Sequence, residues 1–134
     1  MKKTILLAED DKRLATALTV RLDAAGYNVL AVPDAFRSYM AAVGQKPDLI
    51  LMDITMPYGE GFAVARELRD VNLSDIPIIF MTASSRKSLY QQAQELGAAG
   101  FFRKPFDSKA LLATIAQLLN KSKRNNPALD DQVD

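Results

Sequence analysis

Short apolar segments alternate with helix-like segments along this chain, and this alternation limits its fold more than any other feature. Each apolar segment has the length and the β-branched content of a strand. The five segments are residues 4–8, 27–32, 49–52, 76–81 and 100–102. Neighbouring parallel strands need a long crossover, which is right-handed and usually contains a helix. The alternation therefore predicts a parallel sheet covered by helices.

The connecting segments carry apolar residues at helical spacing. In the first, Leu14, Leu18 and Leu22 lie on one helical face before Gly26, a residue type that commonly ends helices. Asp107 is placed to cap the last helix. The same spacing recurs at residues 62–68, 89–96 and 111–119. The second connection, residues 34–44, is the least regular, and we predict a helix there as well.

Two of the predicted strands are apolar throughout. Residues 50–52 and 78–81 show no alternation of apolar and polar side chains, as expected for strands that are buried on both faces of a sheet. We therefore predict an α/β fold: a single doubly wound, five-stranded parallel sheet with five helices on its two faces.

The composition limits the chemistry mainly through what is missing. At 134 residues the chain has the size of one domain. Its 17 Lys and Arg against 16 Asp and Glu leave a net charge of +1, which gives no broad basic surface for nucleic acid or a membrane. The chain has no Cys and no His. Disulfides, thiolate or imidazole metal ligands and histidine-based hydrolysis are therefore excluded.

The two ends of the chain differ from the rest in composition. At the start, an apolar run stops at Glu9, well short of the ~7–15 apolar residues of a signal-peptide core. We therefore expect a cytoplasmic protein. The end is polar, contains Pro127 and has no apolar periodicity. We predict one domain over residues 1–120 and a flexible tail or linker stub over residues 121–134.

Polar residues follow four of the five predicted strands. They are Glu9 and Asp10, then Asp53, Thr82 and Lys104. In doubly wound sheets, ligands bind beyond the carboxyl ends of the strands. Each residue alone has a simpler interpretation, because Asp and Thr often cap helices and a single Lys is usually solvated. Their occurrence at four strand ends favours one shared site.

This set of side chains suits phosphoryl transfer. Carboxylates that lie close together repel one another, and a hard divalent cation such as Mg²⁺ relieves the repulsion. A carboxylate beside the cation, such as that of Asp53, can attack a phosphoryl group and form an acyl phosphate. The Lys104 ammonium and the Thr82 hydroxyl would then share the negative charge of the phosphoryl oxygens with Mg²⁺.

Four short motifs contain these residues. They are Ile5-Leu6-Leu7-Ala8-Glu9-Asp10-Asp11, Asp53-Ile54-Thr55-Met56-Pro57 with Gly61, Thr82-Ala83, and Lys104-Pro105-Phe106. Through these motifs, residues 3–120 resemble the receiver domains of response regulators in two-component signalling, including the chemotaxis regulators. The resemblance implies a flavodoxin-like sheet with strand order 2-1-3-4-5.

The resemblance also implies roles for single residues. Asp53 would be the phosphoacceptor, and Thr82 and Lys104 would contact the phosphoryl group. The implied Mg²⁺ ligands are Glu9, acting mainly through water, Asp10, Asp53 and the carbonyl of Thr55. Asp11 would cap the first helix, and the Lys104–Pro105 peptide bond would be cis.

The resemblance implies a signalling switch rather than an enzyme. Because the chain has no His, the donor phosphohistidine would belong to a histidine kinase or a phosphotransfer protein. Phosphorylation would then change a surface for an unknown output protein near Tyr90 and Phe101, although Phe101 could equally be a plain core residue. We expect no direct contact with nucleic acid or with a membrane.

Four other functions are compatible with parts of this pattern. Phosphatases of the haloacid dehalogenase type also use an Asp nucleophile, but they carry a second Asp where this chain has Thr55. A flavodoxin-like cofactor binder needs a phosphate loop after the first strand, where this chain has three acidic residues. A complete transcription factor needs a second domain. The remaining alternative is a receiver domain taken from a longer regulator or a hybrid histidine kinase.

Overall fold

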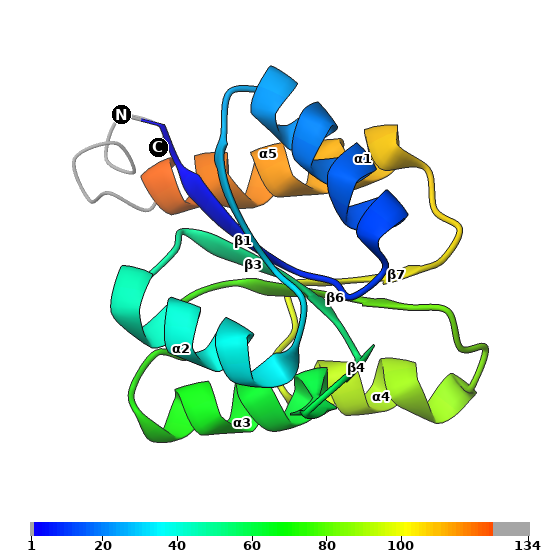
Figure 1. Ribbon diagram of the computed structural model, residues 1–134. Coiled ribbons are helices and arrows are strands. Elements are labelled where there is room, and N and C mark those ends of the chain that lie inside the picture. Colours follow the sequence, from blue (N-terminus) through cyan, green and yellow to red (C-terminus); the bar gives the residue numbers. More distant parts are fainter. Residues whose placement is uncertain (1, 125–134) are drawn as a thin grey trace.

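A five-stranded parallel sheet forms the centre of the computed structural model, which describes the backbone of residues 2–124 and the side chains of residues 2–120 (Figure 1). Its strand order is β2-β1-β3-β6-β7. Because β4 and β5 form a separate sheet, β6 and β7 are the fourth and fifth strands of this one, and the order is the predicted 2-1-3-4-5. The strands are β1 (Thr4–Ala8), β2 (Asn28–Val32), β3 (Leu49–Asp53), β6 (Ile78–Thr82) and β7 (Gly100–Arg103). All five predicted strands are confirmed.

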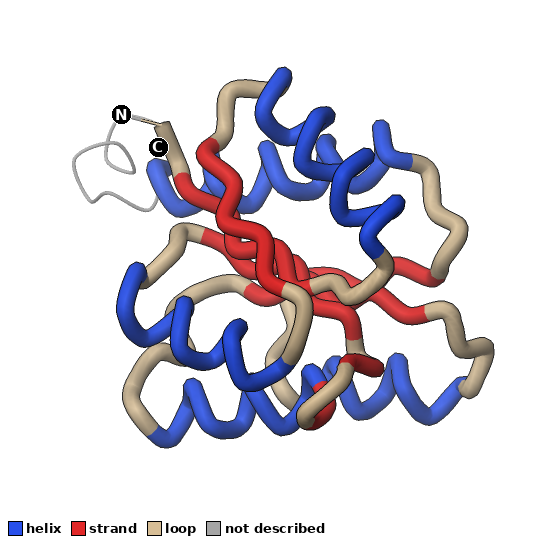
Figure 2. Tube along the Cα trace, viewed as in Figure 1, coloured by secondary structure: helices blue, strands red, loops and turns tan. Residues whose placement is uncertain are grey.

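Five helices cover the two faces of this sheet, as predicted (Figure 2). They are α1 (Lys12–Ala24), α2 (Ala35–Gln45), α3 (Gly61–Asp70), α4 (Lys87–Glu95) and α5 (Ser108–Arg124). In Figure 1, α1 and α5 lie on one face of the sheet, and α2, α3 and α4 lie on the other. The doubly wound arrangement is therefore confirmed.

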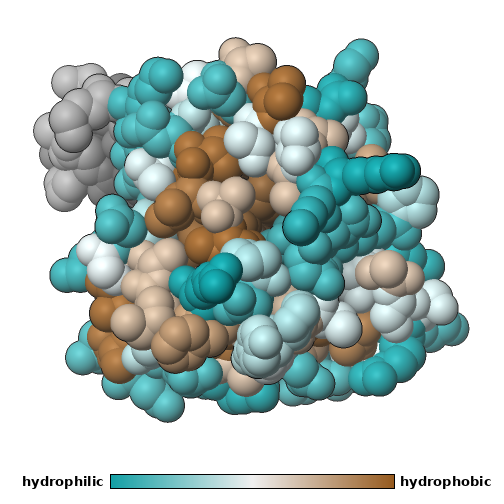
Figure 3. Space-filling model, viewed as in Figure 1, coloured by the Kyte–Doolittle hydropathy of each residue, from teal (hydrophilic) through white to brown (hydrophobic). Residues whose placement is uncertain are grey.

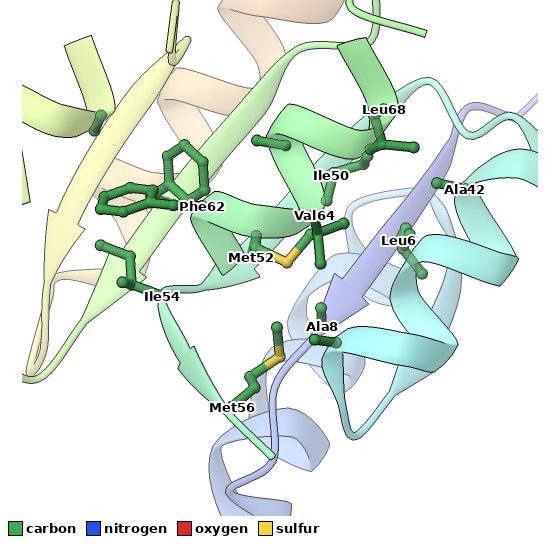
Figure 4. Packing of buried hydrophobic residues seen from close by; sticks show 14 of the residues in the cluster. Leu6, Ala8, Ala42, Ile50, Met52, Ile54, Met56, Phe62, Val64 and Leu68 are labelled. Carbon is green, nitrogen blue, oxygen red and sulfur yellow. The ribbon is translucent and has the colours of Figure 1, made fainter. Parts of the chain in front are cut away.

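Two apolar clusters, one on each face of the sheet, hold the layers together. On the face of α2, α3 and α4, Met52 points toward Val64 (Figure 4), and the rings of Phe62 and Phe80 meet edge to face at 4.9 Å. Leu22 of α1 is fully buried in the other cluster. Each such side chain stabilises the fold by roughly 1.5–3 kcal/mol. Strand β3 contributes to both clusters, which explains why it is apolar throughout.

Helix α2 buries a polar residue and exposes apolar ones. Ser38 is fully buried, and its hydroxyl donates a hydrogen bond to the carbonyl of Ala35 at 2.8 Å. Phe36 and Met40 are 63% and 53% exposed. This inverted pattern is the physical reason why the second connection showed the least regular apolar spacing.

The predicted caps of the first and last helices are confirmed. The Asp11 carboxylate accepts hydrogen bonds from the amides of Arg13 and Leu14 at 3.0 and 3.2 Å. The Asp107 carboxylate accepts one from the amide of Lys109 at 2.9 Å. Each contact satisfies an amide of the first helical turn that has no partner within the helix.

The last helix runs past the predicted limit of the domain at residue 120. Apolar spacing ends at Leu119, but α5 continues to Arg124. Lys and Arg, which are frequent after Leu119, have high helix propensity. The rest of the predicted tail, residues 125–134, lies outside the described residues. Within residues 2–124, no helix is both long enough and apolar enough to cross a membrane.

A short hairpin after β3 was not predicted. Strands β4 (Thr55–Met56) and β5 (Gly59–Glu60) pair antiparallel. Pro57 and Tyr58 form the turn between them, and Tyr58 has a positive φ of 58°. Proline followed by a residue with positive φ is typical of a type II turn. The hairpin leads directly from Asp53 into α3, and it therefore forms part of the surroundings of the candidate site.

Candidate functional site

The predicted site residues meet at the carboxyl edge of the sheet. Asp53, the last residue of β3, pairs with Met81 of β6, and Thr82 is the next residue along β6. Glu9 follows the last residue of β1, and Lys104 follows the last residue of β7. The strand order places β3 between β1 and β6, so that Asp53 lies at the centre of this edge.

Lys104 joins two carboxylates at this edge. Its ammonium nitrogen Nζ lies 2.8 Å from Asp53 Oδ2 and 2.6 Å from Glu9 Oε1. Burial alone would lower the pKa of Lys104, but its hydrogen bonds to Asp53 and Glu9 outweigh that effect and raise the pKa above its usual value. The lysine is therefore held in its charged form between the two acids.

Glu9 is buried although it carries a carboxylate. The residue is 3% exposed. Its Oε2 accepts a hydrogen bond from the amide of Asp11 at 3.0 Å, and Oε1 contacts the Lys104 ammonium at 2.6 Å. Burial raises the pKa of Glu9 to about 7, and the contacts with Lys104 and Asp11 offset only part of this shift. A buried carboxylate close to two other carboxylates is suited to hold a cation or its water.

Asp53 is buried at 5% exposure, and both of its carboxylate oxygens accept hydrogen bonds. The amide of Thr55 donates to Oδ1 at 3.0 Å, and Lys104 donates to Oδ2 at 2.8 Å. The two donors fix the direction of the carboxylate. They also link it to two separate parts of the fold, the hairpin and the end of β7.

Gly61 allows the backbone to fold closely around Asp53. A Cβ atom at this position would lie 2.5 Å from the carbonyl oxygen of Asp53 and 2.8 Å from Cγ of Met52. The amide of Gly61 also donates to the carbonyl of Ile54 at 2.8 Å. Only glycine fits here without a shift of the backbone that carries Asp53. The sequence contained Gly61 within a motif, but its role depends on a contact that the sequence does not show.

Thr82 lies next to the site with its hydroxyl turned toward the following loop. The residue is 1% exposed, and Oγ1 accepts a hydrogen bond from the amide of Ser84 at 3.0 Å. Among the described residues it makes no hydrogen bond to Asp53. The backbone is nevertheless tied to the site, because the carbonyl of Thr82 accepts a hydrogen bond from the amide of Lys104 at 2.7 Å.

Three carboxylates at this edge form a candidate metal site. Glu9, Asp10 and Asp53 each offer an oxygen, and these oxygens lie within 4.8 Å of one another. Asp10 is exposed, whereas the other two acids are buried. Three carboxylates and the one ammonium of Lys104 leave two negative charges. This charge and the all-oxygen donor set fit a hard divalent cation such as Mg²⁺.

The fourth predicted metal ligand, Thr55, takes part through its backbone. Its side chain is exposed, and its amide binds Asp53. The role of its carbonyl stays a prediction. The Lys104–Pro105 peptide bond is cis, as predicted. The structure thus brings Glu9, Asp10, Asp53 and Lys104 into one cluster and places Thr82 and Thr55 at its margin.

An open hollow lies beside this cluster. Its volume is ≈ 390 Å³. The residues that line it are Asp11, Leu14, Ala83, Lys104, Pro105 and Phe106. Lys104 therefore contacts both buried carboxylates and borders a surface that another molecule can reach.

Comparison with known proteins gives a consistent result. A family model described as response regulator receiver domain matches residues 5–116. The DNA-binding dual master transcriptional regulator RpaA of Synechocystis sp. is 34% identical over 90% of this chain and 50% of its own length. The phosphate regulon transcriptional regulatory protein PhoB of Pseudomonas aeruginosa is 36% identical over 90% of this chain and 53% of its own. The chain spans about half the length of these curated relatives.

Solved structures agree with the sequence comparison. The non-phosphorylated HemR receiver domain from Leptospira biflexa is 31% identical, has a TM-score of 0.81, and is matched over 88% of this chain and 94% of its own. The chemotaxis response regulator CheY4 of Vibrio cholerae is 25% identical with a TM-score of 0.80, over 88% of this chain and 99% of its own. The match extends over nearly the whole of both solved chains.

Proposed function

This chain belongs to the family of response regulator receiver domains, and from that premise we propose that Asp53 is its phosphoacceptor. Receiver domains are signalling switches of two-component systems rather than enzymes with a separate substrate. The phosphoryl group would come from a phosphohistidine of a histidine kinase or a phosphotransfer protein, since the chain has no His. The only reaction catalysed would be the gain and loss of this phosphoryl group.

The observation that carries this proposal is the setting of the Asp53 carboxylate. It is buried, it lies 2.8 Å from the Lys104 ammonium, and it belongs to a cluster of three acids. In the proposed step, a carboxylate oxygen of Asp53 attacks the phosphorus, a P–O bond forms, and the P–N bond to the donor imidazole breaks. The electron pair of that bond stays on the imidazole. Lys104 would remain close to the phosphoryl oxygens and offset their charge.

A divalent cation completes the proposed site. Mg²⁺ bound by Asp10, Asp53 and the Thr55 carbonyl, with Glu9 acting through water, would neutralise charge on the phosphoryl oxygens. Asp10 supports this assignment because its carboxylate is exposed and lies within 4.8 Å of the other two. Lys104 and Mg²⁺ would offset different charges in the site. The lysine contacts the buried oxygens of Glu9 and Asp53, whereas the cation would also be bound by the exposed Asp10.

The proposed partners follow from the same reaction. The hollow beside Lys104 borders the site, and we propose that the donor histidine approaches there. An output protein would recognise the phosphorylated form. We propose a cytoplasmic location, without direct contact with nucleic acid or a membrane. Because this chain covers about half of its curated relatives, it could equally be the receiver part of a longer regulator or a hybrid kinase, with residues 1–120 as the domain and 121–134 as a tail or linker.

Phosphoryl labelling tests the proposal. Acetyl phosphate, or a phosphorylated histidine kinase, should label the protein with Mg²⁺ present and leave it unlabelled after EDTA treatment. Asp53→Asn should abolish labelling, whereas Asp23→Asn, a matched change on the exposed face of α1, should leave it unchanged. Labelling of Asp53→Asn at the wild-type level would disprove the assignment of Asp53.

A further inference from the structure

A groove with exposed apolar walls lies between α2, α3 and the hairpin, and the proposed phosphoryl site does not use it. Its volume is ≈ 230 Å³. Phe36 and Met40 of α2 line it, and so does Tyr58 of the hairpin, which is 83% exposed. Val43, 38% exposed, lies further along α2. Figure 3 shows that apolar and weakly polar residues gather on the surface over α2, next to strongly hydrophilic residues.

The arrangement of α2 suggests that these apolar side chains are there to be covered. Phe36, Met40 and Val43 are spaced at four and three residues, so they lie along one side of the helix. The same helix buries Ser38, a polar residue, on its inner side. A surface helix normally has the opposite pattern. Burying this apolar side against a partner would remove it from water.

Tyr58 adds an independent observation. Its φ of 58° lies in the left-handed region, which bulky residues other than glycine rarely adopt. Its ring is nevertheless almost fully exposed beside the groove. The turn between β4 and β5 requires this backbone conformation, and it places the Tyr58 ring beside the groove instead of in the core. The hairpin therefore holds a large, exposed aromatic ring beside the groove.

The charges around the groove indicate the chemistry of its partner. Glu60 and Glu67 line the groove, both are exposed, and neither forms an ion pair within the described residues. In the adjoining hollow, Asp34 pairs with Arg37 at 3.6 Å. Three acids and one arginine leave two negative charges. A partner with Lys or Arg beside its apolar residues would complement them.

Two other occupants fit this charge less well. A second copy of the chain, docked about a two-fold axis, would bring Glu60 and Glu67 of both copies to the same interface. The segment 125–134 of this chain contains three Asp and no Lys or Arg, so it would be repelled by the same two glutamates. Helices α2 and α3 pack against each other, and an amphipathic helix can lie along a groove between two helices, whereas a strand would need a free sheet edge.

We propose that this groove is a docking site for an amphipathic helix of a partner protein, with apolar side chains along one face and Lys or Arg beside them. The inference goes beyond the phosphoacceptor role and does not depend on it. Phe36, Met40 and Tyr58 would contact the apolar face of the partner helix. Glu60 and Glu67 would contact its basic residues.

Two designed peptides test the proposal by NMR titration of the unphosphorylated protein. Both have ~18 residues and leucines at helical spacing, and they differ only in carrying lysines or glutamates beside the leucines. We expect the lysine peptide to shift the amide signals around Phe36, Tyr58 and Glu67. Two ion pairs predict that it binds about tenfold more tightly than the glutamate peptide.

Three variants define the site. Phe36→Ser should weaken binding of the lysine peptide at least several-fold. Val20→Ser on α1 should leave this binding unchanged, although both side chains are 63% exposed. The double variant Glu60→Lys/Glu67→Lys should reverse the preference between the peptides. Equal binding of both peptides, shifts confined to other faces, or self-association that depends on Phe36 would each overturn the proposal.

Discussion

Lys104 Nζ lies 2.8 Å from Asp53 Oδ2 although 51 residues separate them in the sequence. The same nitrogen lies 2.6 Å from Glu9 Oε1, and the side chain of Lys104 is only 17% exposed. One ammonium therefore offsets two buried carboxylates. Three of the strand ends at this edge of the sheet are connected through this single side chain.

Removing this ammonium should destabilise the protein and slow its phosphorylation. In Lys104→Ala, Glu9 and Asp53 would face each other without a cation, and we expect the free energy of unfolding without Mg²⁺ to fall by about 3 kcal/mol near neutral pH. Urea titration measures this loss. Lys109→Ala, an exposed lysine of α5, serves as the control. Equal stability of the two variants would show that the ion pairs contribute little.

Mg²⁺ should stabilise the protein through the three acids. Binding to the folded state alone raises the melting temperature as the Mg²⁺ concentration increases. Asp10→Asn removes an exposed carboxylate of the cluster, and we expect it to weaken Mg²⁺ binding about tenfold or more while the metal-free protein stays folded. Thermal unfolding with increasing MgCl₂ measures both effects, with Asp23→Asn as the control. A wild-type response in Asp10→Asn would place the metal elsewhere.

The pKa of Glu9 predicts a pH dependence of stability without Mg²⁺. Because burial raises this pKa from 4.5 to about 7, the folded protein binds the proton more tightly than the unfolded chain. The stability contributed by the protonated acid is thus complete below pH 4.5 and is lost as the pH rises through 7. In EDTA, Glu9→Gln should therefore gain stability relative to the wild type between pH 5 and 8, by about 3 kcal/mol at most. A difference that stays constant over this range would contradict the pKa shift.

The close approach of Gly61 to Asp53 predicts a sensitive position outside the acidic cluster. Gly61→Ala would put a Cβ 2.5 Å from the carbonyl oxygen of Asp53, and the backbone must move. We expect a loss of about 1–3 kcal/mol and slower labelling of Asp53. Gly44→Ala is the matched control, because nothing lies within 4 Å of its added Cβ and a helical Gly→Ala change should stabilise by roughly 0.5–1 kcal/mol. Urea titration and labelling of both variants measure the difference.

The sequence predicted the layers and the meeting of the site residues because both follow from regular patterns. Parallel strands place their carboxyl ends at one edge, so Asp53, Thr82 and Lys104 could be expected to converge before any distance was known. The roles of these residues stay predictions until phosphorylation is measured.

Features without a repeating pattern were not predictable in the same way. The hairpin at residues 55–60 has strands of two residues, too short for any periodicity, although the order Pro57-Tyr58-Gly59 is a turn signal. The link between Lys104 and Glu9 depends on side-chain conformations. Helix α2 was predicted, but from the least regular spacing. Ser38 is buried and Phe36 is exposed, which reverses the pattern that identifies a surface helix from its sequence.

Two routes of contacts leave Asp53 toward the surface. One runs through the Thr55 amide and the hairpin to α2, where the amide of Ala35 donates to the carbonyl of Pro57 at 3.1 Å. The other runs along β6, next to Asp53, and past Thr82 toward α4. There the ring of Tyr90 meets that of Phe101 edge to face at 5.5 Å, and Tyr90 is 52% exposed.

Phosphorylation should shift the populations of conformations of the face formed by α4, β7 and α5, which we expect to bind the output protein. A phosphoryl group shifts such an equilibrium only by binding one state better, and a hydrogen bond to the Thr82 hydroxyl would compete with its present contact to Ser84. We expect a phosphoryl mimic, beryllofluoride with Mg²⁺, to change NMR signals across residues 84–104. Phe101→Leu, which removes the edge-to-face contact with Tyr90, should diminish the change at Tyr90. Phe102→Leu, on the opposite face of β7, should not. If the signals that change lie only in the loops around Asp53, then Phe101 is a plain core residue and the output surface lies elsewhere.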